Sequence, residues 1–127
     1  MLHPSPTNAF TVDFEDWYQG LEIPSSDWAG FEDRIPESGR RILSLLAEAN
    51  VRGTFFVLGA VAERHPELIR EIAAGGHEIG THGWSHTLIY KMSPGRAPLR
   101  AETLHRASRG SLRRARRGPP ADGGNAR

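Results

Sequence analysis

The chain has 127 residues, of which 38% are hydrophobic, 24% are charged and none is cysteine. This composition fits one soluble domain and excludes collagen-like, disulfide-rich and membrane-spanning classes, and any bound metal must be held by histidine and carboxylate side chains. The first ten residues show no basic segment followed by an apolar one, so we expect no export signal and a cytoplasmic chain.

The net charge of +1 conceals two segments of opposite sign. Residues 1–95 carry a net charge of −6, whereas residues 96–127 carry +7, and every basic residue of the second segment is arginine. Arginine, glycine and proline dominate the end of the chain and cannot bury enough apolar area to offset the entropy of ordering. We therefore expect a folded part over residues 1–95 and a low-complexity, disordered or out-of-frame tail over residues 96–127.

The first predicted element is a short strand over residues 8–14, which mixes β-branched and aromatic side chains. Three acids, Asp13, Glu15 and Asp16, stand at its carboxyl end. Residues 17–35 contain glycine, proline, serine and aromatic residues without a clear period. This pattern favours a long irregular loop of the kind that often borders a site.

Helices and strands then alternate along the chain. Residues 36–49 predict an amphipathic helix that ends at Asn50, and residues 66–74 predict a second helix that ends at a pair of glycines. Between them, residues 52–58 form the near-continuous apolar run that is typical of a strand covered on both faces, and residues 77–81 form a third strand. This order predicts right-handed βαβ units and an α/β fold.

Two histidines, His82 and His86, directly follow the third strand in the sequence THGWSH. On a helical turn this spacing puts both imidazoles on one side, where two nitrogens can bind one cation at about 2.0–2.1 Å. Surface histidines without a ligand are the alternative, because such pairs also arise by chance. In parallel α/β folds, however, sites lie at the carboxyl ends of strands, where the three acids also fall.

These two clusters predict a metal-dependent hydrolytic site. One carboxylate and two histidines make a three-ligand site that leaves room for water and suits Zn²⁺ or another divalent ion. A second carboxylate beside it could act as a general base on that water. The alternative for the acids is an exposed, solvated strand end.

Three sequence features occur in the order and spacing of a known family. They are TVDFEDWYQ, RGTFFVLGAVAERHPELIREIAAGGHEIGTHGWSH and, within the second, the pair His82 and His86. Over residues 9 to about 95 the chain resembles the polysaccharide deacetylases of the NodB-homology type, carbohydrate esterase family 4. It is most similar to the branch found near exopolysaccharide and exosortase loci. The resemblance implies the N-terminal portion of a distorted (β/α) barrel and metal-dependent removal of N-acetyl groups from an amino-sugar polysaccharide.

The resemblance also implies roles for individual residues. Asp13 matches the catalytic base of the family, and His82 and His86 match its metal histidines, with Zn²⁺ as the expected metal. The family motif has two adjacent acids, but here an aromatic residue follows Asp13, so either Glu15 or Asp16 supplies the metal carboxylate. Strand alternation favours Glu15, whereas the expected end of the strand before this position favours Asp16, which we prefer.

Two aromatic residues, Trp84 and Tyr18, are candidates for a sugar subsite. Packing at the strand ends explains them equally well. The partner that the resemblance implies is a polymer of N-acetylated amino sugars, and we expect neither a specific nucleic acid nor a membrane.

The chain departs from the family pattern after residue 95. The later Arg-x-Pro and Leu-His motifs are missing, since residues 96–98 and 104–105 match them only superficially. A helix over residues 93–108 would have a sparse apolar face. We therefore expect a truncated product whose activity the missing motifs leave open, and loss of the reading frame near residues 93–96 would explain the departure. The alternatives are a hydrolase of a small amide on the same fold and a non-catalytic fragment whose basic tail binds polyanions.

Overall fold

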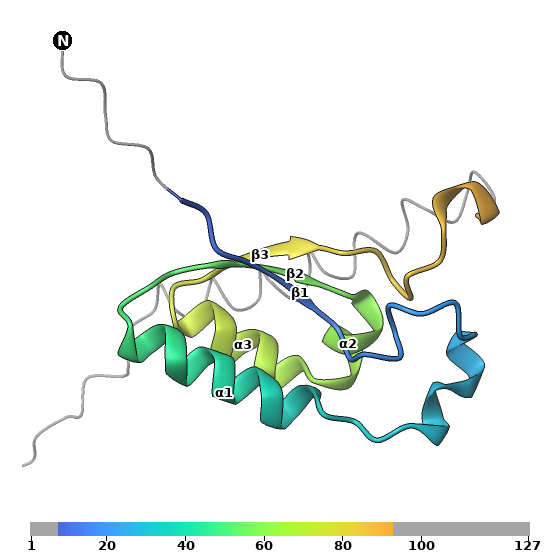
Figure 1. Ribbon diagram of the computed structural model, residues 1–127, viewed down its shortest axis with the longest axis horizontal. Coiled ribbons are helices and arrows are strands. Elements are labelled where there is room, and N and C mark those ends of the chain that lie inside the picture. The colour runs from blue at the N-terminus through green and yellow to red at the C-terminus, as the bar shows by residue number, and fades with distance from the viewer. Residues whose placement is uncertain (1–7, 93–127) are drawn as a thin grey trace, which may run out of the picture.

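The computed structural model describes residues 8–92, and Figure 1 shows how their elements are arranged. In chain order these elements are β1 (Thr11–Phe14), the 3₁₀ helix η1 (Ser25–Gly30), α1 (Ile35–Glu48), β2 (Thr54–Val57), α2 (Gly59–Arg64), α3 (Pro66–Ala74), β3 (Glu78–Thr81) and the 3₁₀ helix η2 (Ile89–Lys91). The predicted helix over residues 93–108 and the basic tail lie outside the described residues, as does the predicted boundary after residue 95.

The three strands form one parallel sheet in the order β1-β2-β3. The register aligns the last residues of all three strands, because Phe14 pairs with Val57 and Val57 pairs with Thr81. Helix α1 lies between β1 and β2, and α2 and α3 lie between β2 and β3. The prediction of an α/β fold with a parallel sheet is confirmed. The carboxyl ends of the strands consequently lie at one edge of the sheet.

Side-chain alternation along the strands explains where the core lies. Phe14, Phe55 and Val57 point to the same face and are buried, and α1 and α3 cover this face in Figure 1. Thr54 and Phe56 occupy the opposite face and are half-buried. Within residues 8–92, β2 is therefore fully covered on one face only, although its sequence predicted cover on both.

The predicted helices agree closely with the observed ones. Helix α1 begins one residue before the predicted start, with a proline in its first turn, and Asn50 follows it in the left-handed region, with φ of 52°. Helix α3 has the predicted bounds. The six-residue helix α2 was not predicted, because so short a helix shows no full apolar period. None of the helices described for residues 8–92 combines the length and hydrophobicity needed to cross a bilayer.

A glycine in the middle of α1 sets how closely this helix approaches the sheet. A Cβ atom on Gly39 would lie 2.8 Å from the Cζ atom of Phe14 and 3.0 Å from a methyl carbon of Leu68. Both neighbours are buried core side chains with little room to move. The close approach of α1 therefore depends on the missing side chain at this position.

We predict that Gly39→Ala lowers the free energy of unfolding. The gain in helix propensity of about 0.8–1.0 kcal/mol is smaller than the cost of overpacking, about 1–3 kcal/mol. Denaturant unfolding measures the difference. The matched control is Gly30→Ala, because a Cβ atom there has no atom within 4 Å, and equal effects of the two substitutions would contradict this explanation.

His77 gives the stability of the fold a defined pH dependence. Its Nδ1 atom accepts the N–H of Gly53 at 3.1 Å and its ring packs edge-on against Phe55. Burial lowers the pKa of His77 below the ordinary 6.5, and the nearby charge of Arg52 lowers it further. Below about pH 6.5 the unfolded chain therefore takes up a proton that the folded chain does not.

We predict that the contribution of His77 to stability is complete above about pH 6.5 and is lost as the pH falls towards its lower folded pKa. His77→Gln keeps an acceptor for the Gly53 N–H but does not titrate. The free energy of unfolding, measured from pH 7.5 to 5.0, should fall less steeply in the variant than in the parent chain. Parallel curves for the two proteins would show that His77 has the same pKa in both states.

Candidate metal centre

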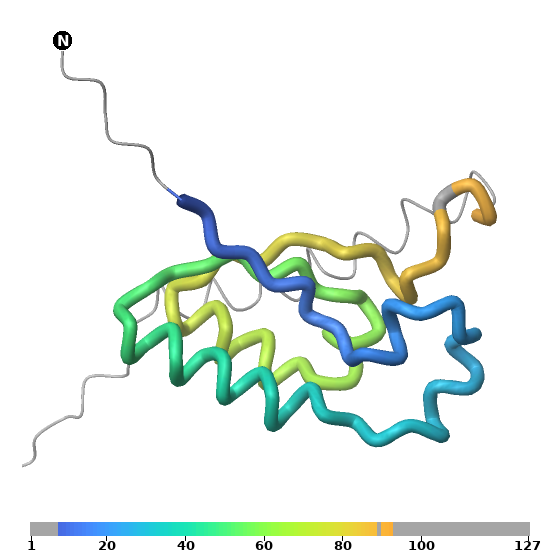
Figure 2. Tube along the Cα trace, viewed as in Figure 1, coloured from blue at the N-terminus to red at the C-terminus, as the bar shows by residue number. Residues whose placement is uncertain are grey.

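The site begins with two residues that directly follow strands. Glu15 follows β1 and His82 follows β3, and the aligned register of the parallel sheet places both at its carboxyl edge. Figure 2 shows the chain after β3 passing beside the chain after β1. His86 comes from the same loop as His82, so two segments far apart in the sequence build one cluster.

The three side chains form a ligand set of the right size for one cation. The Oε2 atom of Glu15 lies 3.5 Å from Nε2 of His82 and 3.5 Å from Nε2 of His86. Each residue offers a ligand atom within 4.8 Å of the other two. Tetrahedral Zn²⁺ with ligands at about 2.1 Å separates its ligand atoms by about 3.4 Å. The distances from the carboxylate to both imidazoles match this spacing.

The burial of the carboxylate points to the same conclusion. The Oε2 atom of Glu15 is buried and has no hydrogen-bond partner among the described residues. Leaving a buried carboxylate oxygen unpaired costs at least about 1–3 kcal/mol. A cation between the three side chains would remove this cost, so Glu15, His82 and His86 fit a divalent metal ion.

Hydrogen bonds fix the loop that carries both histidines. The N–H of His82 donates to the carbonyl of the last residue of β2 at 2.9 Å, which continues the parallel pairing beyond β3. The first N–H groups of α2, from Gly59 and Ala60, donate to the carbonyls of Gly83 and Trp84 at 2.8 and 3.0 Å. The histidine loop is therefore joined to the sheet and to the start of a helix.

Two unusual backbone features shape this loop. Gly59 leaves space for the indole of Trp84, because a Cβ atom at this position would clash with the Cε3 atom of the ring. His86 adopts a left-handed conformation with φ of 55°. This conformation is costly for a residue with a side chain and is enriched at functional sites. The bend leaves the His86 imidazole beside Glu15.

Asp16, the carboxylate that sequence analysis preferred as the metal ligand, has a different position. It is 5% exposed, and its two oxygens accept backbone N–H groups, from Trp17 at 2.9 Å and from Arg34 at 2.7 Å. Arg34 lies at the other end of the long loop, so this carboxylate closes the loop. Within residues 8–92 the structure brings Glu15, and not Asp16, together with the histidines.

A second cluster holds the far end of the same loop. The Oδ2 atom of Asp33 lies 2.8 Å from Nε2 of His65 and 3.0 Å from Nε of Arg64, where α2 meets α3. Its Oδ1 atom accepts the N–H of Ile35 at 3.2 Å. The residues that follow β1 are thus tied to the helices, which limits how far Glu15 can move.

The other predicted site residues divide between surface and core. Asp13 is exposed at the carboxyl edge, and its side chain has no hydrogen bond or ion pair within the described part of the chain. Trp84 is half-buried over Gly59. Tyr18 is 1% exposed and stacks on Phe31 at 4.9 Å between ring centroids. The packing interpretation describes the position of Tyr18, whose ring is not accessible to a sugar.

The pKa of Tyr18 reflects the charged groups that hold the loop. Burial raises the pKa of Tyr18, and the charges of Asp16 and Asp33 raise it further, whereas Arg64 lowers it. The phenol therefore stays neutral beside the two carboxylates that hold the loop.

Sequence analysis missed Gly59 and Asp33 as residues that shape the site. The glycine follows a buried strand, at a point where a close approach of another segment is common, and this signal could have indicated it. Asp33 carries no comparable signal for its contacts with His65 and Arg64, because these two partners lie about thirty residues away in the sequence.

Comparison with known proteins adds an independent line of evidence. The sequence pattern of the family described as polysaccharide deacetylase matches residues 26–107, a range that includes both histidines of the site. A chitooligosaccharide deacetylase from Rhizobium leguminosarum bv. trifolii is 40% identical over 75 residues, which are 51% of this chain and 34% of that protein. A peptidoglycan-N-acetylglucosamine deacetylase from Bacillus cereus is 43% identical over 53 residues, 42% of this chain and 19% of that protein.

A solved structure gives the same relationship. A crystal structure assigned as a polysaccharide deacetylase from Mycobacterium smegmatis superimposes with a TM-score of 0.55 at 32% sequence identity. The superposition covers 84% of this chain and 38% of that one. This chain therefore spans about a third or less of the length of these two curated relatives, and a similar share of the solved structure.

We predict that Glu15→Gln weakens Zn²⁺ binding at least a hundredfold, because it removes the charge of the carboxylate that faces both histidines. Asp16→Asn should change the affinity less than tenfold, since it alters loop closure and not the ligand set. Isothermal titration with ZnCl₂ measures both affinities, and circular dichroism verifies that each variant is folded. A larger loss of affinity from Asp16→Asn than from Glu15→Gln would assign the metal carboxylate to Asp16.

Proposed function

The chain belongs to the polysaccharide deacetylase family, and from this premise we propose that it is a metal-dependent hydrolase that removes N-acetyl groups from an amino-sugar polysaccharide. The observation that carries the proposal is the buried Oε2 atom of Glu15, which has no hydrogen-bond partner among the described residues and lies 3.5 Å from an imidazole nitrogen of both His82 and His86. The names of two relatives specify chitooligosaccharide and peptidoglycan N-acetylglucosamine as their substrates. Both substrates contain N-acetylated amino sugars.

Glu15, His82 and His86 would hold the metal ion. One carboxylate and two imidazoles form a mixed oxygen and nitrogen set, for which Zn²⁺ is the best candidate. When bound there, the ion supplies Lewis acidity that favours attack on an amide carbonyl. Hydrogen bonds join the histidine loop to the sheet and to α2, and Gly59 packs against the indole of Trp84. These contacts keep the ligands in place before substrate arrives.

Asp13 is the candidate general base. It lies two residues before Glu15 at the same edge of the sheet, and its exposed carboxylate is free to accept a proton from the attacking water. Attack forms a bond between the water oxygen and the acetyl carbon, and collapse of the resulting tetrahedral adduct breaks the bond between this carbon and the amide nitrogen. The proton held by Asp13 can then pass to the departing amine, so that acetate and a free amino sugar result.

The exposure of the ligands favours a polymer as substrate. The imidazoles of His82 and His86 are 28% and 34% exposed, so the cluster opens to solvent on one side. An N-acetyl group on a long sugar chain can reach such an edge without the chain having to enter the protein. This geometry supports a polysaccharide over the small-amide alternative.

We predict that the Zn²⁺-loaded full chain releases acetate from N-acetylglucosamine oligomers, and that Asp13→Asn lowers the rate about 10²–10⁴-fold while Zn²⁺ affinity is unchanged. An enzyme-coupled acetate assay measures the rate. The matched control is Asp27→Asn, an exposed aspartate in η1 that should leave the rate unchanged.

Each part of the proposal can fail separately. A Zn²⁺-loaded chain that releases no acetate from any oligomer would refute the deacetylase activity. Faster hydrolysis of acetamide than of the oligomers would refute the preference for a polysaccharide. Wild-type rates in Asp13→Asn would exclude Asp13 as the base.

A further inference from the structure

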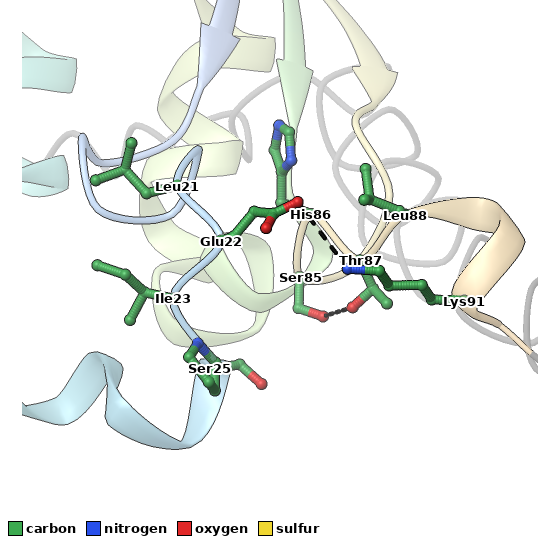
Figure 3. A pocket seen from close by; sticks show the side chains of 10 residues that line it. Leu21, Glu22, Ile23, Ser25, Ser85, His86, Thr87, Leu88 and Lys91 are labelled. Atoms are coloured by element: carbon green, nitrogen blue, oxygen red, sulfur yellow. Dashed lines mark hydrogen bonds and ion pairs between the residues drawn. The ribbon is translucent and has the colours of Figure 1, made fainter.

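An open space separates the two loops that border the metal centre. Its volume is about 220 Å³, and residues 21–25 of the long loop after β1 face residues 85–88 and Lys91 across it (Figure 3). The Nζ atom of Lys91 lies 4.0 Å from Oε1 of Glu22, and the two side chains are 58% and 83% exposed. An ion pair of this length and exposure contributes little to stability. It therefore does little to fix one loop against the other.

The six-residue helix α2 contacts the histidine loop at its first turn. The N–H of Gly59 donates to the carbonyl of Gly83 at 2.8 Å. The N–H of Ala60 donates to the carbonyl of Trp84 at 3.0 Å. Both carbonyls belong to the backbone between the two proposed histidine ligands. The start of α2 therefore helps to fix the path of the chain from one imidazole to the other.

The end of α2 contacts the other loop. Oδ2 of Asp33, which lies near the end of the long loop after β1, is 3.0 Å from Nε of Arg64 and 2.8 Å from Nε2 of His65. The side chains of Asp33 and His65 are 18% and 12% exposed. Shorter distances and lower exposure make these contacts stronger than the ion pair at Lys91. We call Asp33 with its two partners the Asp33 clamp.

Backbone hydrogen bonds and packing make α2 a stiff connection between its two ends. The N–H of His65 donates to the carbonyl of Val61 at 2.9 Å. The carbonyl of His65 accepts the N–H groups of Leu68 and Ile69 at 3.1 and 3.3 Å, so His65 caps both α2 and α3. Val61 and Ala62 of α2 are buried in the core. Because such a core is tightly packed, a shift at one end of α2 is passed on to the other.

Resting on the metal centre of the proposed function, we propose that α2 couples the two loops and that Asp33 is a positioning residue for the metal ligands. The Asp33 clamp holds the end of α2, and the first turn of α2 holds the histidine loop. A loosened clamp lets this loop leave the arrangement in which both imidazoles face Glu15. Apparent metal affinity falls in proportion to the fraction of chains in that arrangement.

The test removes the charge of the clamp with Asp33→Asn in the full chain. The matched control is Glu71→Gln, which breaks the 2.8 Å ion pair between Glu71 of α3 and Arg40 of α1. Isothermal titration with ZnCl₂ should show about tenfold weaker binding for Asp33→Asn and no change for Glu71→Gln. Arg64→Gln should also weaken binding. It decides the test if circular dichroism shows that Asp33→Asn does not fold, because the Arg64 side chain is exposed.

Amide hydrogen exchange distinguishes this coupling from a general loss of stability. In the metal-free variant of Asp33, the N–H groups of Gly59 and Ala60 should exchange several times faster than in the parent chain, because their bonds to the histidine loop open more often. The N–H of Leu46, in the second half of α1, should keep its rate. Nuclear magnetic resonance measures the three rates in one experiment.

The outcomes also separate this inference from the deacetylase activity. Unchanged Zn²⁺ affinity in Asp33→Asn and Arg64→Gln overturns the positioning role, even if the chain releases acetate. Weaker Zn²⁺ binding overturns the route through α2 if Gly59 and Ala60 keep their exchange rates, or if Leu46 exchanges faster to the same degree.

Weaker Zn²⁺ binding together with faster exchange at Gly59 and Ala60 alone supports the inference. It does so even if no acetate is released, a result that would refute only the deacetylase activity. A parent chain that binds no Zn²⁺ would refute the metal centre itself, and the positioning role of Asp33 with it.

Discussion

The candidate site depends on the register of the parallel sheet. Because Phe14, Val57 and Thr81 are paired across the three strands, the residues that follow these strands leave the sheet at the same level. Glu15 and His82 are two of these residues, and their convergence needs no special contact between the loops. A shift of one residue in either pairing would turn one ligand to the other face of the sheet. The hydrophobic alternation that buries Phe55 and Val57 opposes such a shift, so the same side chains that build the core also align Glu15 with His82.

The sequence predicted most of the elements because their signals are local. A helical apolar period, a proline in the first turn and the terminal glycines indicated α3 correctly, and the run around Phe55 indicated a strand in a parallel sheet. The sequence also predicted that the histidine pair and the acids lie at one edge of the sheet. It could not choose between Glu15 and Asp16, because the choice depends on a hydrogen bond from Asp16 to a backbone N–H eighteen residues away. For the same reason, the sequence could not decide whether Tyr18 packs in the core or lines a sugar subsite.

The long loop after β1 is held in a defined position although most of it has no regular secondary structure. Its start is closed by the Asp16 carboxylate, its end is held by Asp33 against His65 and Arg64, and Trp28 holds its middle. The contacts of Asp16 and Asp33 join side chains to groups far away in the sequence, and such contacts leave no periodic trace in it. They nevertheless hold the loop that begins directly after Glu15.

The ligand set also has a topological consequence. Glu15 and His82 are 67 positions apart in the sequence and belong to the two outer strands of the sheet. A cation held between them would act as a reversible cross-link that closes most of the described chain into a loop. Opening of either outer strand would then require release of the ion, so resistance to local unfolding would rise with the concentration of free metal. The lifetime of the folded chain would in this way become a measure of the metal supply around it.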